Sequence, residues 1–304
     1  MSWNGEQKSI YLYKKMNKRI SFLFLALFQL LFANCQNHGE LKILADLPSN
    51  LEENSGIQFY PDNTIWVIED NGNKDEIYGL NLKGKIVKEF KVKNAKNRDW
   101  EDLTRDINGN LYIGDFGNNG NDRKRMTIYK LPNPKKEPGE KIDAEKIEFV
   151  YPEQKKFPPK KEKLYYDTEA FFHWENALYI ITKNRTRPYD GKALIYKVPD
   201  KKGNYEAELV GKFIVCKDQD KCSITSADIS SNGKKIALLT YGYVLIITDF
   251  EFDDFSKGKK QQIELGARTQ LEAVCFKNDS TLLISDEQSH AQGGNLYALD
   301  LSKF

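Results

Sequence analysis

One short pattern returns five times along this sequence, and this repetition constrains the fold more than any other feature. Each repeat opens on a segment with acids or small polar residues, continues into an apolar strand-like run, and then gives a second such run of Ile-Tyr-x-Leu type. The opening segments centre on Ser55, Glu101, Glu169, Ala227 and Glu272. Repeats of this kind, separated by loops of unequal length, are typical of β-propellers, in which each repeat is one blade.

Each repeat supplies enough β-like segments for a four-stranded blade. The second segments lie at 64–73, 110–115, 177–183, 235–241 and 281–287. The third segments lie at 77–80, 127–131, 194–198, 244–247 and 296–299. Fourth segments lie at 86–92, 147–151, 209–215 and 262–265. Their alternation and their aromatic and β-branched content favour half-buried strands.

The fifth repeat ends without a fourth strand, while residues 41–47 form a strand that belongs to no repeat. Pairing the two would close the ring and remove an exposed sheet edge. The sequence therefore predicts an all-β fold, a five-bladed β-propeller of four-stranded blades that is closed by the N-terminal strand; six blades are the alternative.

The start of the chain has the pattern of an export signal. A basic segment, 14–19, precedes an apolar run, 20–33, that is too short to span a bilayer. We expect a signal peptide over 1–34, with Met16 as a possible true start, a lipidated or flexible linker over 35–39, and one propeller domain over 40–304.

The segment Leu31-Phe32-Ala33-Asn34-Cys35 resembles the lipobox of bacterial lipoproteins, in which the cysteine becomes the lipidated first residue. Lipidation of Cys35 would hold the protein on a membrane surface. We expect an exported, cell-envelope protein, anchored by lipid to the outer membrane or facing the periplasm. Ordinary cleavage to a secreted or soluble periplasmic protein is the alternative.

Charge and cysteine usage fit that location. The chain has 46 basic and 44 acidic residues, and residues 1–34 hold five of those bases but one of the acids, so the remainder has no basic excess for nucleic-acid binding. Cys216 and Cys222 flank a short charged segment, and we predict a disulfide between them. We expect Cys275 to be a buried apolar residue.

The recurring acids point to a cation site. In a propeller the first strand of each blade lines the central channel, so residues at its end from different blades face one another. Candidate metal ligands are Glu101, Glu169 and Glu272 in one register, Glu53, Asp99 and Asp167 two residues earlier, and Asp228 in the fourth repeat. Converging carboxylates repel unless a cation or protons compensate them, and an oxygen cage suits Ca²⁺.

Ser55, Thr225 and Gln270 would add neutral oxygen ligands to this cation site. The alternative is structural: the acids would accept backbone N–H bonds and pair with Arg98, Arg105 or Lys183.

Further polar residues are predicted to form a rim around a ligand at the channel mouth. They are Asp70, Asp115, Asn118, Lys183, Tyr241 and Glu287. For the Asp70 and Asp115-to-Asn118 segments a plain turn is the alternative, because Asp, Asn and Gly bond their own backbone and tolerate positive φ.

Several motifs together resemble the SdiA-regulated family of bacterial propellers, which is distantly similar to NHL-repeat proteins. The motifs are Glu53-x-Ser55-Gly56-Ile57, Asp99-Trp100-Glu101-Asp102, Ile113-Gly114-Asp115-Phe116-Gly117-Asn118-Asn119, Asp167-Thr168-Glu169-Ala170 and Ile224-Thr225-Ser226-Ala227-Asp228. The resemblance covers residues 40 to 304. It implies five blades and a calcium site, and no established activity.

No hydrolase, phosphate-loop, zinc or EF-hand motif occurs, and the three histidines, His38, His173 and His290, lie outside the acid motifs. We therefore expect a calcium-associated binding or scaffold module, monomeric, with a protein or small-molecule ligand at the channel mouth. A calcium-dependent hydrolase, lactonase-, phytase- or esterase-like, is the alternative by analogy of fold.

Overall fold

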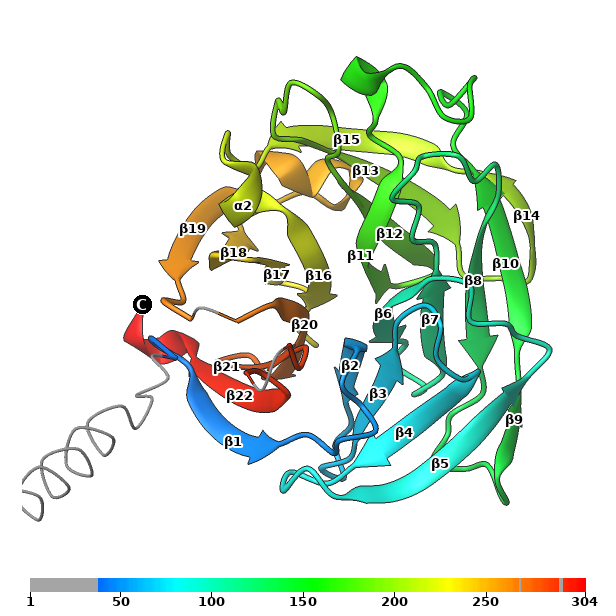
Figure 1. Ribbon diagram of the computed structural model, residues 1–304, viewed down its shortest axis with the longest axis vertical. Helices are drawn as coiled ribbons and strands as arrows, with labels where there is room; N and C mark the ends of the chain where they lie inside the picture. Colours follow the sequence, from blue (N-terminus) through cyan, green and yellow to red (C-terminus); the bar gives the residue numbers. More distant parts are fainter. Residues whose placement is uncertain (1–37, 268, 290–291) are drawn as a thin grey trace, which may run out of the picture. The chain divides into compact units, whose positions relative to one another are not determined.

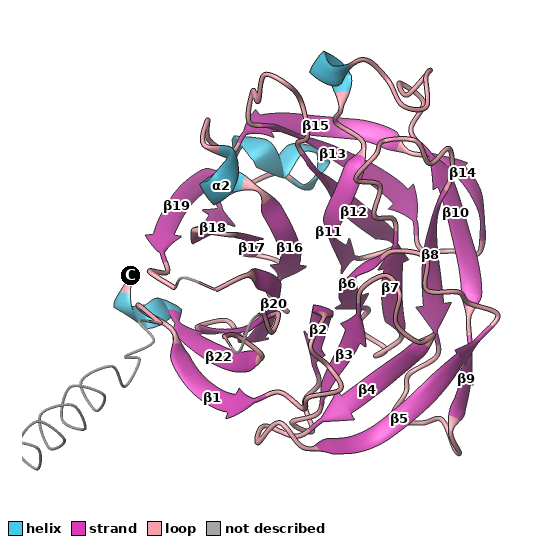
Figure 2. Cartoon of the chain, in the orientation of Figure 1, coloured by secondary structure: helices cyan, strands magenta, loops and turns pink. Residues whose placement is uncertain are grey.

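The five repeats form five β-sheets arranged around a common axis (Figure 1). This is a computed structural model, and it describes residues 38–267, 269–289 and 292–304. Strands dominate the described part, and the few helices are short (Figure 2). The all-β, five-bladed prediction is confirmed.

Each sheet contains an antiparallel blade of four strands, which follow one another from the channel outward. Blade 1 has β2 (Asn54–Phe59), β3 (Ile65–Glu69), β4 (Glu76–Leu80) and β5 (Ile86–Lys93). Blade 2 has β6 (Trp100–Arg105), β7 (Leu111–Asp115), β8 (Met126–Leu131) and β10 (Glu145–Val150). Blade 3 has β11 (Asp167–Trp174), β12 (Ala177–Lys183), β13 (Lys192–Pro199) and β15 (Glu208–Ile214). Blade 4 has β16 (Ile224–Ile229), β17 (Ile236–Thr240), β18 (Tyr243–Thr248) and β19 (Lys259–Glu264).

Blade 5 closes the ring with strands from both ends of the propeller. It consists of β20 (Leu271–Asn278), β21 (Thr281–Asp286), β22 (Asn295–Asp300) and β1 (Lys42–Asp46). β1 pairs antiparallel with β22, with Lys42 opposite Ala298. The predicted closure by the N-terminal strand is therefore confirmed.

Two blades carry a fifth, parallel strand that the sequence did not predict. β9 (Lys141–Asp143) pairs with β5, and β14 (Gly203–Glu206) pairs with β10. In each case a segment leading into the outer strand of one blade adds to the outer strand of the preceding blade. These additions cover two outer edges and join neighbouring blades.

Apolar side chains fill the space between neighbouring blades, in five clusters. Between blades 1 and 2, for example, Trp66 and Trp100 are both almost completely buried. Burial of one large apolar side chain stabilises the fold by about 1.5–3 kcal/mol, so each interface makes a substantial contribution. The inner strands consequently stand at fixed positions around the channel.

The helical segments are η1 (Lys161–Lys163), α2 (Gln219–Cys222), η2 (Phe252–Lys257) and η3 (Leu301–Lys303). Cys216 and Cys222 form a disulfide, with their Cα atoms 5.7 Å apart, and Cys275 is free and buried.

Residues His38–Phe304 form one compact unit. Within the described residues, every helix falls short of the length and apolar character that crossing a membrane requires. The predicted signal peptide, 1–34, and the lipidation site, Cys35, lie outside the described residues.

Candidate functional site

Every inner strand has a register irregularity at the same end of the channel. In each blade one residue has no partner on the second strand, because its two neighbours pair with consecutive residues there. The residues at this position are Ser55, Glu101, Glu169, Thr225 and Glu272, and we call these five residues the bulge ring. A β-bulge re-aims a side chain, and bulges are over-represented beside functional sites.

This register corrects one feature of the sequence analysis. The fourth repeat was expected to centre on Ala227, but the structure places Thr225 at the position of the glutamates. The fourth repeat has a hydroxyl at the position where three other repeats have a carboxylate. The acid that marks this register in the sequence is therefore missing, and the repeat was aligned two residues too far along the chain. Thr225 is buried, and its Oγ1 has no hydrogen-bond partner in the part of the chain that the structure describes, so this bulge position carries an unsatisfied oxygen.

Four of the five bulge residues line one polar pocket of 140 Å³ at this end of the channel. The lining residues are Ser55, Asp70, Glu101, Asn119, Glu169, Lys183, Arg185, Tyr241, Gln270, Glu272 and Glu287. The structure thus brings together the predicted glutamates of three repeats and four residues of the predicted rim. Five carboxylates face two cationic side chains, so the pocket is strongly acidic.

One side of the pocket is neutralised by the protein itself. Lys183 Nζ lies 3.0 Å from Glu169 Oε1 and donates to the Tyr241 hydroxyl at 3.1 Å. Arg185 bridges Asp167 at 2.6 Å and Glu169 at 3.1 Å. Burial still raises the pKa of Glu169 to about 7, although both cations lower it. The structural alternative, pairing with Lys183, therefore describes this side.

The other side gathers acids that form no ion pair among the described residues. One carboxylate oxygen each from Asp70, Asp99 and Glu101 lies within 4.8 Å of the others. Cations that act on this group are bonded elsewhere: Arg123 pairs with Asp115, and Lys183 pairs with Glu169. We call Asp70, Asp99 and Glu101 the acid triad.

The acid triad is unfavourable when it is fully ionised. Burial, followed by the neighbouring carboxylates, raises the pKa of Glu101 well above its usual value. Burial and the charge of Asp70 raise the pKa of Asp99 to about 6. Burial is also the main cause of the raised pKa of Asp70. Folding thus holds three acids where a cation or protons must compensate them.

A glycine in the following turn leaves room for these oxygens. A Cβ on Gly117 would lie 2.0 Å from Glu101 Oε1 and 2.4 Å from Asp99 Oδ2, far inside contact distance. This turn, Asp115-Phe116-Gly117-Asn118, therefore cradles two triad carboxylates with its backbone. The all-oxygen donor set of the triad and the glycine cradle fit a hard divalent cation such as Ca²⁺.

Two further acids, Glu272 and Glu287, line the same pocket. Burial raises the pKa of Glu272 to about 8, opposed by Lys183 and reinforced by Glu169. Burial, Asp70 and Glu53 raise the pKa of Glu287 to about 7, while Gln270 donates to Glu287 at 2.5 Å. These side chains change charge near neutral pH.

Below the bulge ring, a buried carboxylate links three blades. Asp102 accepts hydrogen bonds from the backbone N–H groups of Leu103 at 2.9 Å, Phe171 at 3.2 Å and Ala227 at 3.2 Å, and from the Ser226 hydroxyl at 2.9 Å. A hub of this kind fixes the inner strands β6, β11 and β16 relative to one another.

The remaining predicted metal ligands, Glu53, Asp167 and Asp228, are not among the residues that line this pocket. Glu53 is exposed and accepts from Asn73, and Asp167 is held by Arg185 and by the Asn118 N–H. Asp228 lines a different cavity, where it accepts from the Phe276 N–H at 2.7 Å.

Asp115 and Asn118 are buried, and their polar atoms bond within the protein. The structure therefore gives them the turn role and places neither among the pocket-lining residues. Their bonds position the Gly117 turn over the acid triad.

Sequence reasoning missed Asp102 and the role of Gly117. A signal for Asp102 exists, because it follows a strand-start glutamate directly and a bulge turns consecutive residues toward the same space. Gly117 resembles an ordinary turn glycine, and only the position of the acids shows what it does.

No protein-family model matches this chain, and no curated protein does. Solved structures match its fold. The PQQ-bound aldose sugar dehydrogenase from Streptomyces coelicolor is similar over 86% of this chain and 98% of its own, with 11% identity and a TM-score of 0.53. At this identity the likeness shows the fold alone.

Two further matches are weaker. A streptogramin B lyase matches 81% of this chain and 80% of its own, with 13% identity and a TM-score of 0.42. A catalytically inactive virginiamycin B lyase from Staphylococcus aureus, with quinupristin, matches 84% and 68%, with 15% identity and a TM-score of 0.40.

Proposed function

We propose that this protein is an exported, calcium-associated binding module of the cell envelope. Its cation site is the acid triad, and its ligand, a protein or a small molecule, binds at the adjoining channel mouth beside Lys183, Tyr241 and Glu287. The observation that carries the proposal is the acid triad itself, with three carboxylate oxygens within 4.8 Å of one another.

The physical argument compares the two sides of the pocket. Where the chain supplies Lys183 and Arg185, the carboxylates are neutralised internally. Around Asp70, Asp99 and Glu101, neutralisation is left to protons or to a bound ion. Calcium takes six to eight oxygen ligands at about 2.3–2.6 Å, so water and nearby amide or backbone oxygens would complete its shell.

The resemblance to SdiA-regulated propellers supports this proposal, because it implies a calcium site. The lipobox-like segment before Cys35 supports an anchor on a membrane surface. We propose a monomer that does not bind nucleic acid. Intact mass of the protein from membranes tests the anchor: an acylated Cys35 supports it, and a free N-terminus at another residue contradicts it.

Calcium titration of chelator-stripped protein tests the cation site. We expect one ion per chain in calorimetry and a higher thermal midpoint. At a free calcium concentration of 100 times Kd the stabilisation would be about 2.7 kcal/mol. Asp99→Asn combined with Glu101→Gln should abolish both effects.

The matched control changes two exposed acids with the same spacing. Glu206→Gln combined with Glu208→Gln removes the same charge from β14 and β15, outside the pocket. The control should bind calcium normally. Equal binding by both double variants would contradict the proposed site.

A calcium-dependent hydrolase is the second candidate, and one observation favours it. Glu272 and Glu287 have pKa values raised to about 8 and about 7, which suits proton transfer at neutral pH, and both line the pocket. A divalent cation there would polarise a carbonyl or phosphoryl oxygen. Calcium-dependent turnover of a lactone, phosphoester or aryl ester that Glu287→Gln abolishes would replace the binding module with this function.

A further inference from the structure

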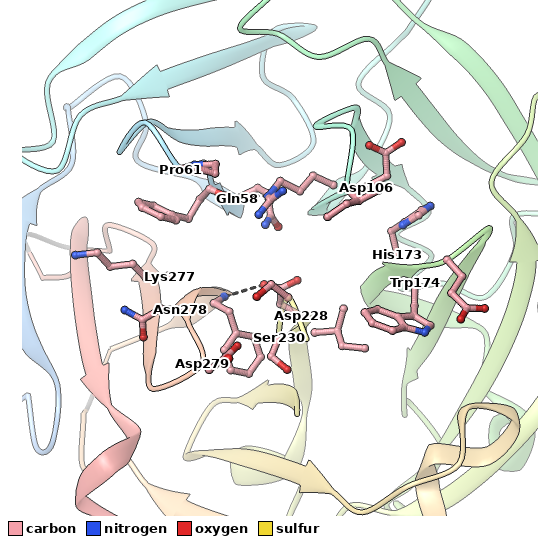
Figure 3. Close-up of a pocket in the computed structure, with 17 residues that line it drawn as sticks. Gln58, Pro61, Asp106, His173, Trp174, Asp228, Ser230, Lys277, Asn278 and Asp279 are labelled. Atoms are coloured by element: carbon pink, nitrogen blue, oxygen red, sulfur yellow. Dashed lines mark hydrogen bonds between the residues drawn. The ribbon is translucent and has the colours of Figure 1, made fainter. Parts of the chain in front are cut away.

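The opposite end of the channel holds a second, larger cavity of 550 Å³. Side chains from all five blades surround it, among them Gln58, Asp106, His173, Asp228 and Lys277 (Figure 3). It is lined by none of the acids of the bulge ring. Nothing in the proposed function uses this cavity.

Gln58 brings an unsatisfied polar atom to the cavity. The residue is 3% exposed, and its Oε1 has no hydrogen-bond partner among the described residues. At the matching position of other inner strands the oxygen is used: Thr104 accepts from the His173 N–H at 3.1 Å, and Asp228 accepts from the Phe276 N–H at 2.7 Å. A buried amide oxygen without a partner costs about 1–3 kcal/mol, and a ligand N–H would satisfy it.

Arg105 brings donors that the protein leaves unused. Its Nε donates to the Phe59 carbonyl at 3.1 Å, and its guanidinium lies over the Tyr60 ring at 5.4 Å. Its two terminal nitrogens make no hydrogen bond to any described residue. Arginine has five N–H donors in a fixed plane, so it offers several to a ligand carbonyl oxygen.

The walls around these polar groups are largely apolar. Phe59, Trp174, Ile229 and Phe276 line the cavity, and Ile107 at its edge is 88% exposed. Trp174 is held in place by stacking on Phe252, with ring centroids 4.9 Å apart. A preformed apolar cavity with a few directed polar groups is the usual form of a small-molecule site.

Charge limits the class of ligand. The residues that line the cavity include two with cationic side chains, Arg105 and Lys277, and four with acidic ones, Asp106, Glu175, Asp228 and Asp279. An anion would meet a net excess of carboxylates, and a cation would meet the guanidinium. A neutral group that carries a hydrogen-bond acceptor next to a hydrogen-bond donor would accept from Arg105 and donate to Gln58 Oε1.

We propose that this cavity is a second binding site, which takes a neutral amide attached to an apolar or aromatic body. The amide oxygen accepts from Arg105, its N–H donates to Gln58 Oε1, and the apolar body lies against Trp174 and Phe276. A peptide bond and the amide of a small metabolite share this chemistry. The site is independent of calcium.

Three probes of nearly equal shape test the proposal: 3-phenylpropanamide, 4-phenyl-2-butanone and 3-phenylpropanoate. Ligand-observed NMR titration gives the Kd of each, with and without chelator. The amide should bind about tenfold more tightly than the ketone, which lacks the N–H, and more tightly than the carboxylate. N-acetyl-L-phenylalaninamide, as a fourth probe, shows whether a peptide-like amide binds better than a primary amide.

Variants assign the contacts. Gln58→Leu should weaken the amide about tenfold and leave the ketone unchanged, whereas Arg105→Met should weaken both. Arg125→Met, at an exposed arginine outside the cavity, is the matched control and should change neither. Thermal midpoints of all variants show that they are folded.

Several results would overturn the proposal. They are tightest binding by the carboxylate, equal binding by all three probes, no binding by any probe, or amide binding that Gln58→Leu leaves intact. Loss of amide binding on chelation would contradict its independence from the acid triad.

Discussion

Gly117→Ala is the sharpest perturbation of the acid triad, because it adds one methyl group and removes no ligand. The new Cβ would lie 2.0 Å from Glu101 Oε1 and 2.4 Å from Asp99 Oδ2, whereas real Cβ contacts stay beyond 3.0 Å. At least one carboxylate must therefore move by about 1 Å. Metal–ligand distances tolerate about 0.2 Å, so this displacement removes a ligand.

We expect calcium affinity to fall about 10–100-fold, the size of effect seen when the support of metal ligands is disturbed. The cost in stability should be about 1–3 kcal/mol, as for other overpacking substitutions. Isothermal titration calorimetry well below the melting temperature measures the affinity of folded protein.

Gly120→Ala is the matched control in the same loop. Its Cβ would meet the Asp122 carboxyl group at 3.3 Å, a contact that a side chain can relieve by turning. It should bind calcium as the natural protein does. If Gly117→Ala also binds with unchanged affinity, the proposed geometry of the triad is wrong.

Three further predictions concern stability. First, the pKa values of Glu272 and Glu287 are raised from 4.5 to about 8 and about 7, so the folded state holds more protons than the unfolded state. Without calcium, the thermal midpoint should therefore fall as pH rises from about 5 to 8. Saturating calcium should weaken this trend, because its binding to the acid triad strengthens as Asp99 and Glu101, whose pKa values are raised, lose their protons. Second, Asp102→Asn replaces one acceptor oxygen with an amide donor that faces two N–H or O–H groups. The free energy of unfolding, measured in urea, should therefore fall by about 2–6 kcal/mol. An unchanged urea midpoint would refute the role of Asp102 as a hub. Third, Gln58→Leu removes a buried unsatisfied oxygen, so the urea midpoint of this variant should equal or exceed that of the natural protein. A clear loss of stability would show that Gln58 Oε1 has a hydrogen-bond partner.

The sheets follow from the sequence because alternation and turn residues are local signals. The strand of residues 41–47 had no repeat of its own, and the fifth repeat had no outer strand, so closure was predictable. Strand β9 could not be predicted, because Lys141–Asp143 is short, has one apolar residue and pairs with a strand that is distant in the sequence. Its place depends on the neighbouring blade.

The convergence of Glu101, Glu169 and Glu272 also followed from the repeats. Their division into a neutralised side and the acid triad did not, because the sequence offered Arg98, Arg105 or Lys183 as partners without showing which acid each one reaches. Arg185, which lies two residues after the end of β12, was not among them. The bulges shift the register by one residue, so that Thr225, which was expected only as an added oxygen donor, stands at the position of the glutamates in place of Ala227. The role of Asp102, which directly follows the bulge residue Glu101, was not predicted. The cavity at Gln58 carries no repeated motif at all.

The most direct test is a high-resolution crystal structure of calcium-soaked protein with anomalous data. We predict one calcium peak bonded to oxygens of Asp70, Asp99 and Glu101 at about 2.4 Å, with Lys183 still paired to Glu169. A map in which the triad carboxylates bond only to water or to protein cations, with no anomalous peak between them, would contradict the claim that these acids share a counter-ion.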